Sequence, residues 1–265
     1  EKTKTIMDKT IATYDALVTQ MAESSEIKRY YANQTPVENT RAFLAEVKQS
    51  DPSIETAYFG LQDKRYLFNI DDGRTDYDPT QRGWYKGAVS TPGKLYYLQP
   101  EEDFLTKKLL ITVSKTIQQG EATLGVASID ITLENIQTLF KDIKITDSGY
   151  LEVIAPNDIV ISSPLEDRIG KTLDTNDYIL SKIQDSESGF FNTTIDGVPK
   201  VCYFTSDNVK NWKYIGIVDE SALKENSNAV IRLLIFITII SIIAVTIISL
   251  IFRKHLKGIF EELTR

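Results

Sequence analysis

Hydrophobic residues that recur every three or four positions predict a long helix over residues 1–31. No proline or glycine interrupts this segment. A second helix is predicted over residues 37–49, because Asp51-Pro52 is a stop signal for a helix. We expect the first helix to rise from a membrane and to line the domains that follow. Its regularly spaced apolar positions are Ile6, Ile11, Tyr14, Leu17 and Met21.

Short apolar segments separated by turn residues predict a first group of antiparallel strands. A short helix that carries Trp84 and Tyr85 is expected to start at Asp78-Pro79, and a helix over residues 132–142 closes the group. The predicted strands are residues 56–61, 65–69, 94–98, 109–117 and 123–131.

A second, smaller group of strands begins at residues 147–149. Asp196-Gly197 between two of its strands is a strong type I′ hairpin signal. Helices are expected over residues 175–185 and from Asp219 onwards. The predicted strands are residues 150–155, 159–163, 189–195, 198–205 and 212–218. Because each group consists of antiparallel strands flanked by helices, the predicted fold class is α+β.

Residues 233–252 form a run of 20 apolar or uncharged residues without charge, proline or glycine. A helix of this length spans the hydrocarbon core of a bilayer, about 30 Å thick. The alternative is a buried core helix, which rarely stays apolar on every side for so long. We therefore predict a transmembrane helix. Arg253, Lys254 and Lys257 follow it directly, so the positive-inside rule places residues 253–265 in the cytoplasm.

The charge of the remaining chain is strongly negative. Residues 229–265 hold five of the 30 lysines and arginines and two of the 37 acidic residues, which leaves a net charge of −10 on residues 1–228. This part is predicted to lie outside the cell, and its charge argues against nucleic-acid binding. With 265 residues and 42% hydrophobic residues, the composition is that of a folded protein with two small cores.

Residue counts exclude several kinds of active site. The chain has one cysteine, Cys202, and one histidine, His255. A disulfide framework, a cysteine-based metal site and a Ser-His-Asp triad are therefore excluded, and we expect neither a metal nor a cofactor. An enzyme would have to use carboxylates such as Glu101, Glu102 and Asp103 for acid–base chemistry, and it stays a minor alternative.

The densest group of chemically useful side chains lies between Asp76 and Tyr85, in the sequence DYDPTQRGWY. Arg82 offers a planar fork of donors that suits a carboxylate. Trp84 and Tyr85 supply rigid apolar walls with polar tips, and Tyr77 lies close by in the sequence.

Two carboxylates further along the chain complete the set of candidates, Asp103 in PEEDF and Asp130 in VASIDIT. Asp130 closes an almost wholly apolar strand, where a carboxylate is costly unless a donor meets it. Two roles are open for it. It either caps the N-terminus of the next helix or accepts the ammonium group of a ligand.

Taken together, these residues resemble the double Cache sensor domain, which occurs outside the membrane in bacterial chemoreceptors and sensor kinases. The segment SGYLEVIAPNDIVISSP is similar to the second lobe of that family, and the resemblance covers residues 1–252. The residues that match its first-lobe motif are Tyr77, Arg82, Trp84, Tyr85, Pro100, Asp103, Gly125 and Asp130.

One subset of this family binds amino acids, and the resemblance implies the same roles here. Tyr77, Arg82, Trp84 and Tyr85 would hold the carboxylate end of the ligand. Asp103 and Asp130 would pair with its ammonium group. The chain departs from the motif at Glu101, where the family has a tyrosine. Glu101 either favours an additional cationic group on the ligand or points to solvent.

The resemblance also implies an organisation. The function implied is the extracellular sensor of a transmembrane chemoreceptor for a small molecule, with an amino acid as the expected ligand. A histidine-kinase sensor for an amine or small carboxylate is the alternative.

Expected partners are the membrane, a second copy of the chain that packs along the first helix, and downstream signalling proteins. A first membrane helix before Glu1 is also expected. The expected parts are a long helix over 1–35, a membrane-distal lobe with the ligand pocket over 36–145, a membrane-proximal lobe over 146–220, a helix that enters and spans the membrane over 221–252, and the start of a HAMP-like helix over 253–265.

Overall fold

The structure is a computed structural model of the chain. Its backbone divides into two compact units, Glu1–Val218 and Asp219–Arg265. The first unit holds both β-sheets, apart from the last residue of the final strand. The described residues are 2–71, 73, 75–103, 106–140, 143, 145–146, 148–174, 176–184, 186–207, 210–223, 235–239 and 241.

The N-terminal segment forms two helices, α1 (Lys2–Glu23) and α2 (Ser25–Tyr31), so the prediction of one continuous helix was wrong. The break lies at Ser24, whose backbone leaves the helical region with φ −56° and ψ 131°. Its Oγ accepts a hydrogen bond from the backbone N–H of Glu26 at 3.1 Å and thereby caps α2. Helix α3 (Val37–Ser50) follows as predicted.

The first sheet has the five antiparallel strands that the hydrophobic pattern predicted, and their order is β2-β1-β5-β4-β3. Strand β5 lies in the middle, between β1 and β4, so a side chain on β5 is far from both edges. The bounds are β1 (Ile54–Leu61), β2 (Tyr66–Phe68), β3 (Leu95–Glu102), β4 (Leu109–Gln119) and β5 (Ala122–Thr132).

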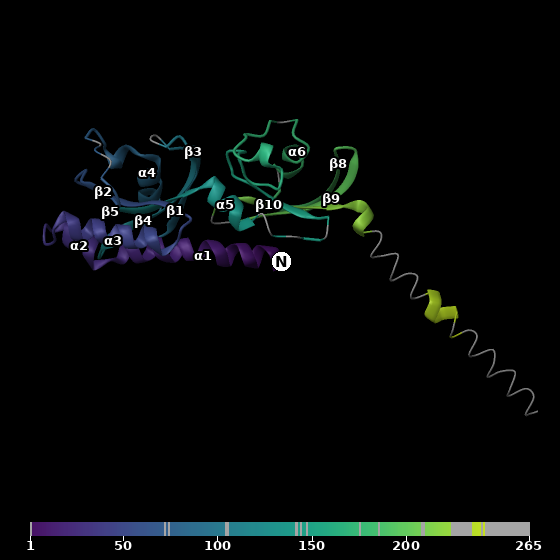
Figure 1. Ribbon diagram of the computed structural model, residues 1–265, viewed down its shortest axis with the longest axis horizontal. Helices are drawn as coiled ribbons and strands as arrows, with labels where there is room; N and C mark the ends of the chain where they lie inside the picture. Colours follow the sequence, from purple (N-terminus) through teal and green to yellow (C-terminus); the bar gives the residue numbers. More distant parts are fainter. Residues whose placement is uncertain are drawn as a thin grey trace, which may run out of the picture. The chain divides into compact units, whose positions relative to one another are not determined.

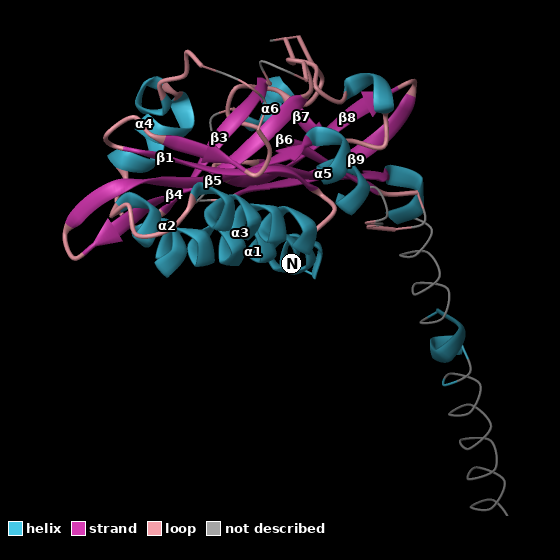
Figure 2. Cartoon of the chain, turned by 60° about the vertical axis from the view of Figure 1, so that its left-hand side comes forward, coloured by secondary structure: helices cyan, strands magenta, loops and turns pink. Residues whose placement is uncertain are grey.

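The two faces of this sheet carry different helices. Helices α1 and α3 lie along one face, and α4 (Gly83–Ser90), which follows the short 3₁₀ helix Pro79–Gln81, lies on the other (Figures 1 and 2). Side chains on a strand alternate between the faces. Phe59, Ile111 and Ile129 therefore join the core beneath α1 and α3. Their neighbours in sequence point to the face beneath α4.

The second sheet repeats this plan, with strand order β7-β6-β10-β9-β8. Helix α5 (Leu133–Phe140) connects the two sheets along the chain. The two antiparallel sheets confirm the α+β class. The bounds are β6 (Tyr150–Ile154), β7 (Val160–Ser162), β8 (Ser188–Ile195), β9 (Val198–Ser206) and β10 (Lys213–Asp219). We call the first sheet with α1–α4 the first lobe, and the second sheet with α6 the second lobe.

Helix α6 spans only Leu180–Ile183, so the helix predicted over residues 175–185 was too long. Asp177 explains where it starts. Its Oδ1 accepts hydrogen bonds from the backbone N–H groups of Ile179 and Leu180, at 2.9 and 3.3 Å. An aspartate whose carboxylate accepts hydrogen bonds from the backbone N–H groups two and three residues later favours a turn at its own position. The helix therefore does not extend back to residue 175.

One apolar core joins the two lobes. It contains Tyr14 and Met21 from α1, strand residues of the first sheet, and Val153 and Trp212 from the second lobe. The rings of Tyr97 in β3 and Trp212 lie 6.1 Å apart in an edge-to-face arrangement. Trp212 is therefore a core residue that packs between the two lobes.

The C-terminal predictions fall largely outside the described residues. A helical turn over residues 220–223 follows β10. Of the predicted membrane span, only residues 235–239 and 241 are described. Across the described part of the chain, no helix is long and apolar enough to cross a membrane. The predicted span, the HAMP-like helix and the domain boundaries stay predictions.

Candidate functional site

Asp130 is a buried carboxylate in the middle of the first sheet, with 7% of its surface exposed. It lies opposite Thr112 on β4 and opposite Thr56 on β1. Thr112 Oγ1 donates to Asp130 Oδ1 at 2.7 Å, and Tyr58 Oη donates to the same oxygen at 2.9 Å. Within the described part of the chain, no donor reaches Oδ2. One oxygen of a buried carboxylate is thus left for another donor.

The helix-capping role that was open for Asp130 is wrong. The hydroxyl of Thr132 accepts the backbone N–H of Asn135 at 3.2 Å, at the start of α5. Asp130 lies two residues before Thr132 and is still a strand residue with its side chain on the α4 face. Its two hydrogen bonds come from neighbouring strands instead of from the helix.

Burial raises the pKa of Asp130 to about 7. The hydrogen bonds from Thr112 and Tyr58 oppose this rise, whereas the negative charges of Asp103 and Glu101 add to it. The pKa of the Tyr58 phenol lies well above its usual value, because the hydroxyl is buried beside this carboxylate. The Tyr58 hydroxyl therefore stays protonated and keeps donating to Asp130.

Aromatic side chains surround Tyr58 on the same face of the sheet. The ring of Phe68 stacks on Tyr58 at 4.8 Å, and Trp84 meets it edge to face at 5.1 Å. Tyr85 contacts Trp84 at 5.6 Å, and both are buried. Helix α4 thus places Trp84 and Tyr85 over the strand that hydrogen-bonds Asp130. Rigid rings of this kind exclude water from the groups between them.

Tyr77 and Arg82 lie beside each other at the rim of this aromatic group. The Tyr77 ring packs against Tyr66 at 4.8 Å and against Phe68 at 5.6 Å. The guanidinium carbon of Arg82 is 5.5 Å from the centre of the Tyr77 ring. Arg82 is exposed. In the described part of the chain its guanidinium has neither a hydrogen bond nor an ion pair, so its fork of donors is available to a ligand.

Glu101 and Asp103 come from the end of β3. Asp103 Oδ2 accepts hydrogen bonds from the backbone N–H and the hydroxyl of Thr106, at 2.6 and 2.9 Å. Glu101 is exposed, yet partial removal of its carboxyl from water raises its pKa. Arg82 opposes that rise and Asp103 adds to it, so the three charges act on one another.

The structure therefore brings the predicted residues to one face of the first sheet, but in two groups. Arg82 with Tyr77 forms one group, and Asp130 with the α4 aromatics forms the other. No ion pair links Arg82 to Asp130 among the described residues. The pattern of apolar positions predicted the strand of Tyr58, but the roles of Tyr58, Thr112 and Phe68 were missed. The pairing of β1 and β4 with β5 brings Tyr58 and Thr112 to Asp130, and the pairing of β2 with β1 brings Phe68 to Tyr58.

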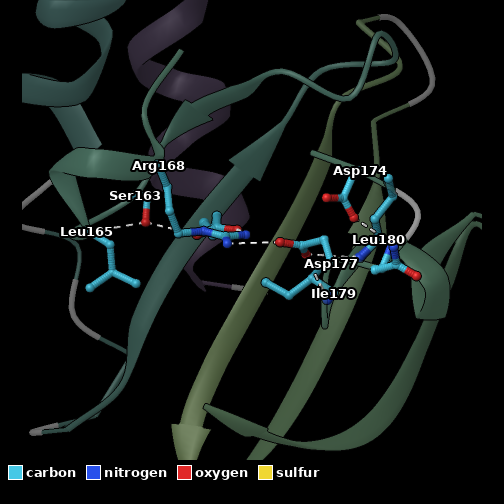
Figure 3. A network of polar contacts seen from close by, with 9 residues as sticks. Ser163, Leu165, Arg168, Asp174, Asp177, Ile179 and Leu180 are labelled. Atoms are coloured by element: carbon cyan, nitrogen blue, oxygen red, sulfur yellow. Dashed lines mark hydrogen bonds and ion pairs between the residues drawn. The ribbon is translucent and has the colours of Figure 1, made fainter. Parts of the chain in front are cut away.

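The second lobe carries a network in which the charged groups pair with one another. Glu152, fully buried on β6, accepts hydrogen bonds from Arg168 Nε and Nη2, at 3.1 and 2.9 Å, and from Ser163 Oγ at 2.8 Å. Arg168 Nη1 reaches Asp177 at 2.9 Å, as Figure 3 shows. The ring of Tyr178 lies 4.7 Å from this guanidinium.

Arg168 and Arg82 occupy corresponding places in the two lobes. Each comes from the segment between the second and third strands of its sheet, and the two sheets have the same strand order. Two carboxylates of the protein neutralise Arg168, whereas Arg82 has no such partner among the described residues. Only the first lobe offers an available arginine at this place.

Comparisons with known proteins agree on one family. The family model of the Cache domain matches residues 1–227. The chain is 26% identical over 244 residues to the methyl-accepting chemotaxis protein McpC of Bacillus subtilis, with 91% of this chain and 36% of that protein covered. It is 29% identical over 191 residues to TlpB of the same organism, with 72% and 28% covered. The chain spans about a third of the length of these curated relatives.

Solved structures of chemoreceptor ligand-binding domains share the fold. The domain of CtaA from Pseudomonas fluorescens in complex with L-serine superposes with a TM-score of 0.66 at 20% identity, covering 83% of this chain and 93% of that one. The domain of PctB from Pseudomonas aeruginosa PAO1 in complex with L-Arg has a TM-score of 0.64 at 21% identity, covering 82% and 91%.

Proposed function

Because the chain belongs to the Cache domain family, we propose that it is the extracellular sensor region of a transmembrane chemoreceptor that binds an amino acid. Its relatives are methyl-accepting chemotaxis proteins, and the chain is a sensor domain rather than an enzyme. The proposed location is the cell membrane, because residues 233–252 form an uncharged run long enough to span a bilayer. In this proposal residues 1–228 lie outside the cell.

The observation that carries the ligand class is the state of Asp130. Asp130 is a buried residue whose Oδ1 already accepts two hydrogen bonds, while its Oδ2 receives no donor from the described residues. A ligand ammonium would supply the missing donors and would also offset the cost of burying a charge. Arg82 would hold the carboxylate of the same ligand with its fork of donors. The structures of CtaA with L-serine and of PctB with L-Arg support the same class.

The remaining site residues have supporting roles in this proposal. Tyr77 would hold Arg82 in place by packing against its guanidinium. Trp84 and Tyr85 would cover the ligand and keep water from the two charged contacts. Asp103 would add a second carboxylate near the ammonium group, consistent with its effect on the pKa of Asp130.

The second lobe is proposed to transmit the signal without binding a ligand of its own. Its arginine, Arg168, is neutralised by Glu152 and Asp177, so it has no charge to offer. Charged side chains that hold one another in place stiffen this part of the lobe, which suits an element that transmits a movement.

A buried polar junction between the lobes is the proposed route for that movement. Tyr97 on β3 donates a hydrogen bond to Asp15 on α1. Lys210 Nζ pairs with Asp207 at 2.7 Å and lies 5.5 Å from the centre of the Tyr97 ring. Strand β3 also carries Glu101, and the loop of Lys210 leads directly into β10. A ligand-induced shift of β3 would therefore reach the last strand before the C-terminal segment.

Three further parts of the proposal concern the rest of the receptor. The segment after β10 would continue into the membrane span at residues 233–252. A second copy of the chain would pack along α1 to form a dimer. Downstream signalling proteins would bind the cytoplasmic part of the receptor.

Thermal unfolding of the 265-residue chain in detergent, with and without each of the twenty L-amino acids, amines and small carboxylates, tests the ligand class. A ligand at 100 times its Kd adds about 2.7 kcal/mol to stability, which is a shift of several degrees in Tm. We expect such a shift with at least one amino acid, and its loss in Arg82→Ala and in Asp130→Ala. Lys86→Ala, an exposed change on α4, serves as the matched control and retains the shift. A chain that unfolds cooperatively yet responds to no amino acid would overturn the proposal.

A further inference from the structure

A β-bulge in β3 turns Glu101 toward the face of the sheet that carries Asp130. Leu98 pairs with Thr112, but Glu101, three residues later, pairs with Leu110, only two residues away on β4. The extra residue reverses the alternation of side chains beyond it. Glu101 therefore lies on the same face as Leu98, Thr112 and Asp130. Without the bulge its side chain would point to the face beneath α1.

Glu101 has no cation of its own in the described part of the chain. It forms neither a hydrogen bond nor an ion pair there. Two lysines follow it closely in sequence, but each pairs elsewhere. Lys107 Nζ is 3.3 Å from Glu102, and Lys108 Nζ is 3.0 Å from Glu55. The carboxylate of Glu101 thus faces the site without an ion pair, and Arg82 acts on it only from a distance.

The charges of the site do not balance around a neutral amino acid. The carboxylate of such a ligand would neutralise Arg82, and its ammonium would pair with Asp130 Oδ2. Glu101 would then remain unpaired beside two other carboxylates, Asp103 and Asp130. A second positive group on the ligand would remove this imbalance.

We propose that the site selects amino acids with a cationic side chain, and that Glu101 is the specificity-determining residue that binds the side-chain cation. This inference rests on the proposed binding of amino acids. One strand separates β3 from β5, and the β4 partners of Glu101 and Asp130 are two residues apart, so the backbones at these two positions are about 12 Å apart. A chain of three or four methylene groups with a hydrogen-bonded cation at each end covers such a spacing.

Calorimetric titration of the 265-residue chain in detergent tests this inference with pairs of ligands of nearly equal shape. L-lysine is compared with L-norleucine, and L-arginine with L-citrulline, so that each pair differs mainly in the side-chain charge. We expect the cationic member to bind about tenfold more tightly, the effect of one charge-assisted contact at a partly exposed site. Glu101→Gln should abolish this preference. Glu102→Gln is the matched control, because the adjacent Glu102 faces the other side of the sheet, and it should keep the preference.

The outcomes separate this inference from the proposed function. If norleucine and citrulline bind as tightly as their cationic partners, or if Glu101→Gln leaves the preference intact, Glu101 does not select the ligand and the inference is overturned. Amino-acid binding itself would stand in that case. If Glu101→Gln tightens norleucine binding without weakening lysine binding, Glu101 shields Arg82 instead, which also overturns it. If no amino acid binds at all, the proposed function fails first.

Discussion

Tyr58 and Asp130 are joined by a buried hydrogen bond of 2.9 Å, between adjacent strands of the first sheet. The same Tyr58 ring packs against Trp84 on α4. A change in the charge of Asp130 would therefore act on a side chain that packs against α4. In the proposed function, this contact would couple ligand binding and protonation to the position of α4.

Protonation of Asp130 should make both stability and binding depend on pH. Its pKa is raised to about 7, above the value of about 3.9 in an unfolded chain, so its contribution to stability is present at low pH. That contribution is lost as the pH rises through 7, at up to about 1.4 kcal/mol per pH unit. Asp130→Asn should flatten this dependence, measured by urea unfolding between pH 5 and 8.

Binding should show the opposite trend, because an ammonium ligand prefers the ionised carboxylate. Affinity should rise between pH 6 and 8, and protons should be released on binding at pH 6, seen as a buffer-dependent heat in calorimetry. A constant affinity over this range would show that Asp130 does not contact the ammonium group.

Gly60→Ala should displace side chains that line the candidate site. A Cβ at Gly60 would lie 2.4 Å from Pro79 Cβ and 3.0 Å from the Trp84 ring, so both must move. We expect a loss of about 1–3 kcal/mol in the free energy of unfolding and weaker ligand binding. Gly120→Asn is the control, since nothing lies within 4 Å of its Cβ and asparagine tolerates its φ of +62°. Equal effects of the two substitutions would contradict the packing argument.

Arg168→Met should destabilise the second lobe. It leaves the fully buried Glu152 without its cation, which costs about 3–5 kcal/mol in comparable buried pairs. Arg29→Met removes an exposed pair with Glu26 and should cost less than about 1 kcal/mol. Urea unfolding followed by circular dichroism measures both. Ligand affinity should be unchanged in a folded Arg168→Met chain, and a loss of affinity would place a ligand in the second lobe.

Lys210→Met tests the junction between the lobes. Asp207 would lose its lysine at 2.7 Å, and the nearby Asp15 would lose a favourable charge. Burial already raises the pKa of Asp15, so removing Lys210 raises it further. We expect a loss of about 3 kcal/mol at pH 7 that becomes smaller toward pH 4, where the carboxyls are protonated. A loss that does not change with pH would mean that Lys210 acts through packing alone.

Tyr97→Phe is the matched probe for the same junction, because it removes only the hydroxyl that reaches Asp15. Ligand affinity should be retained in this variant, since Tyr97 points away from the site. Hydrogen exchange of β10 should then no longer respond to ligand. A normal response of β10 would show that the signal takes another route.

The hydrophobic pattern by itself determined most of the architecture. Short apolar segments separated by turn residues predicted all ten strands of the described part of the chain to within a few residues. It failed where a local hydrogen bond competes with the helix. Ser24 breaks the N-terminal helix, and Asp177 shortens α6.

For the candidate site too, the sequence predicted one part and the tertiary structure decided another. The order of Arg82, Trp84, Asp103 and Asp130 in the sequence was enough to predict the family and one shared site. Only the tertiary structure decided which groups are available. Arg82 and Arg168 look alike in the sequence, yet only Arg168 is neutralised, by the buried Glu152 on β6 and by Asp177. The role of Asp130 depends on Tyr58 and Thr112, which come from strands 72 and 18 residues away. Strand pairing brings these side chains together, and the register of a sheet depends on contacts between segments far apart in the chain.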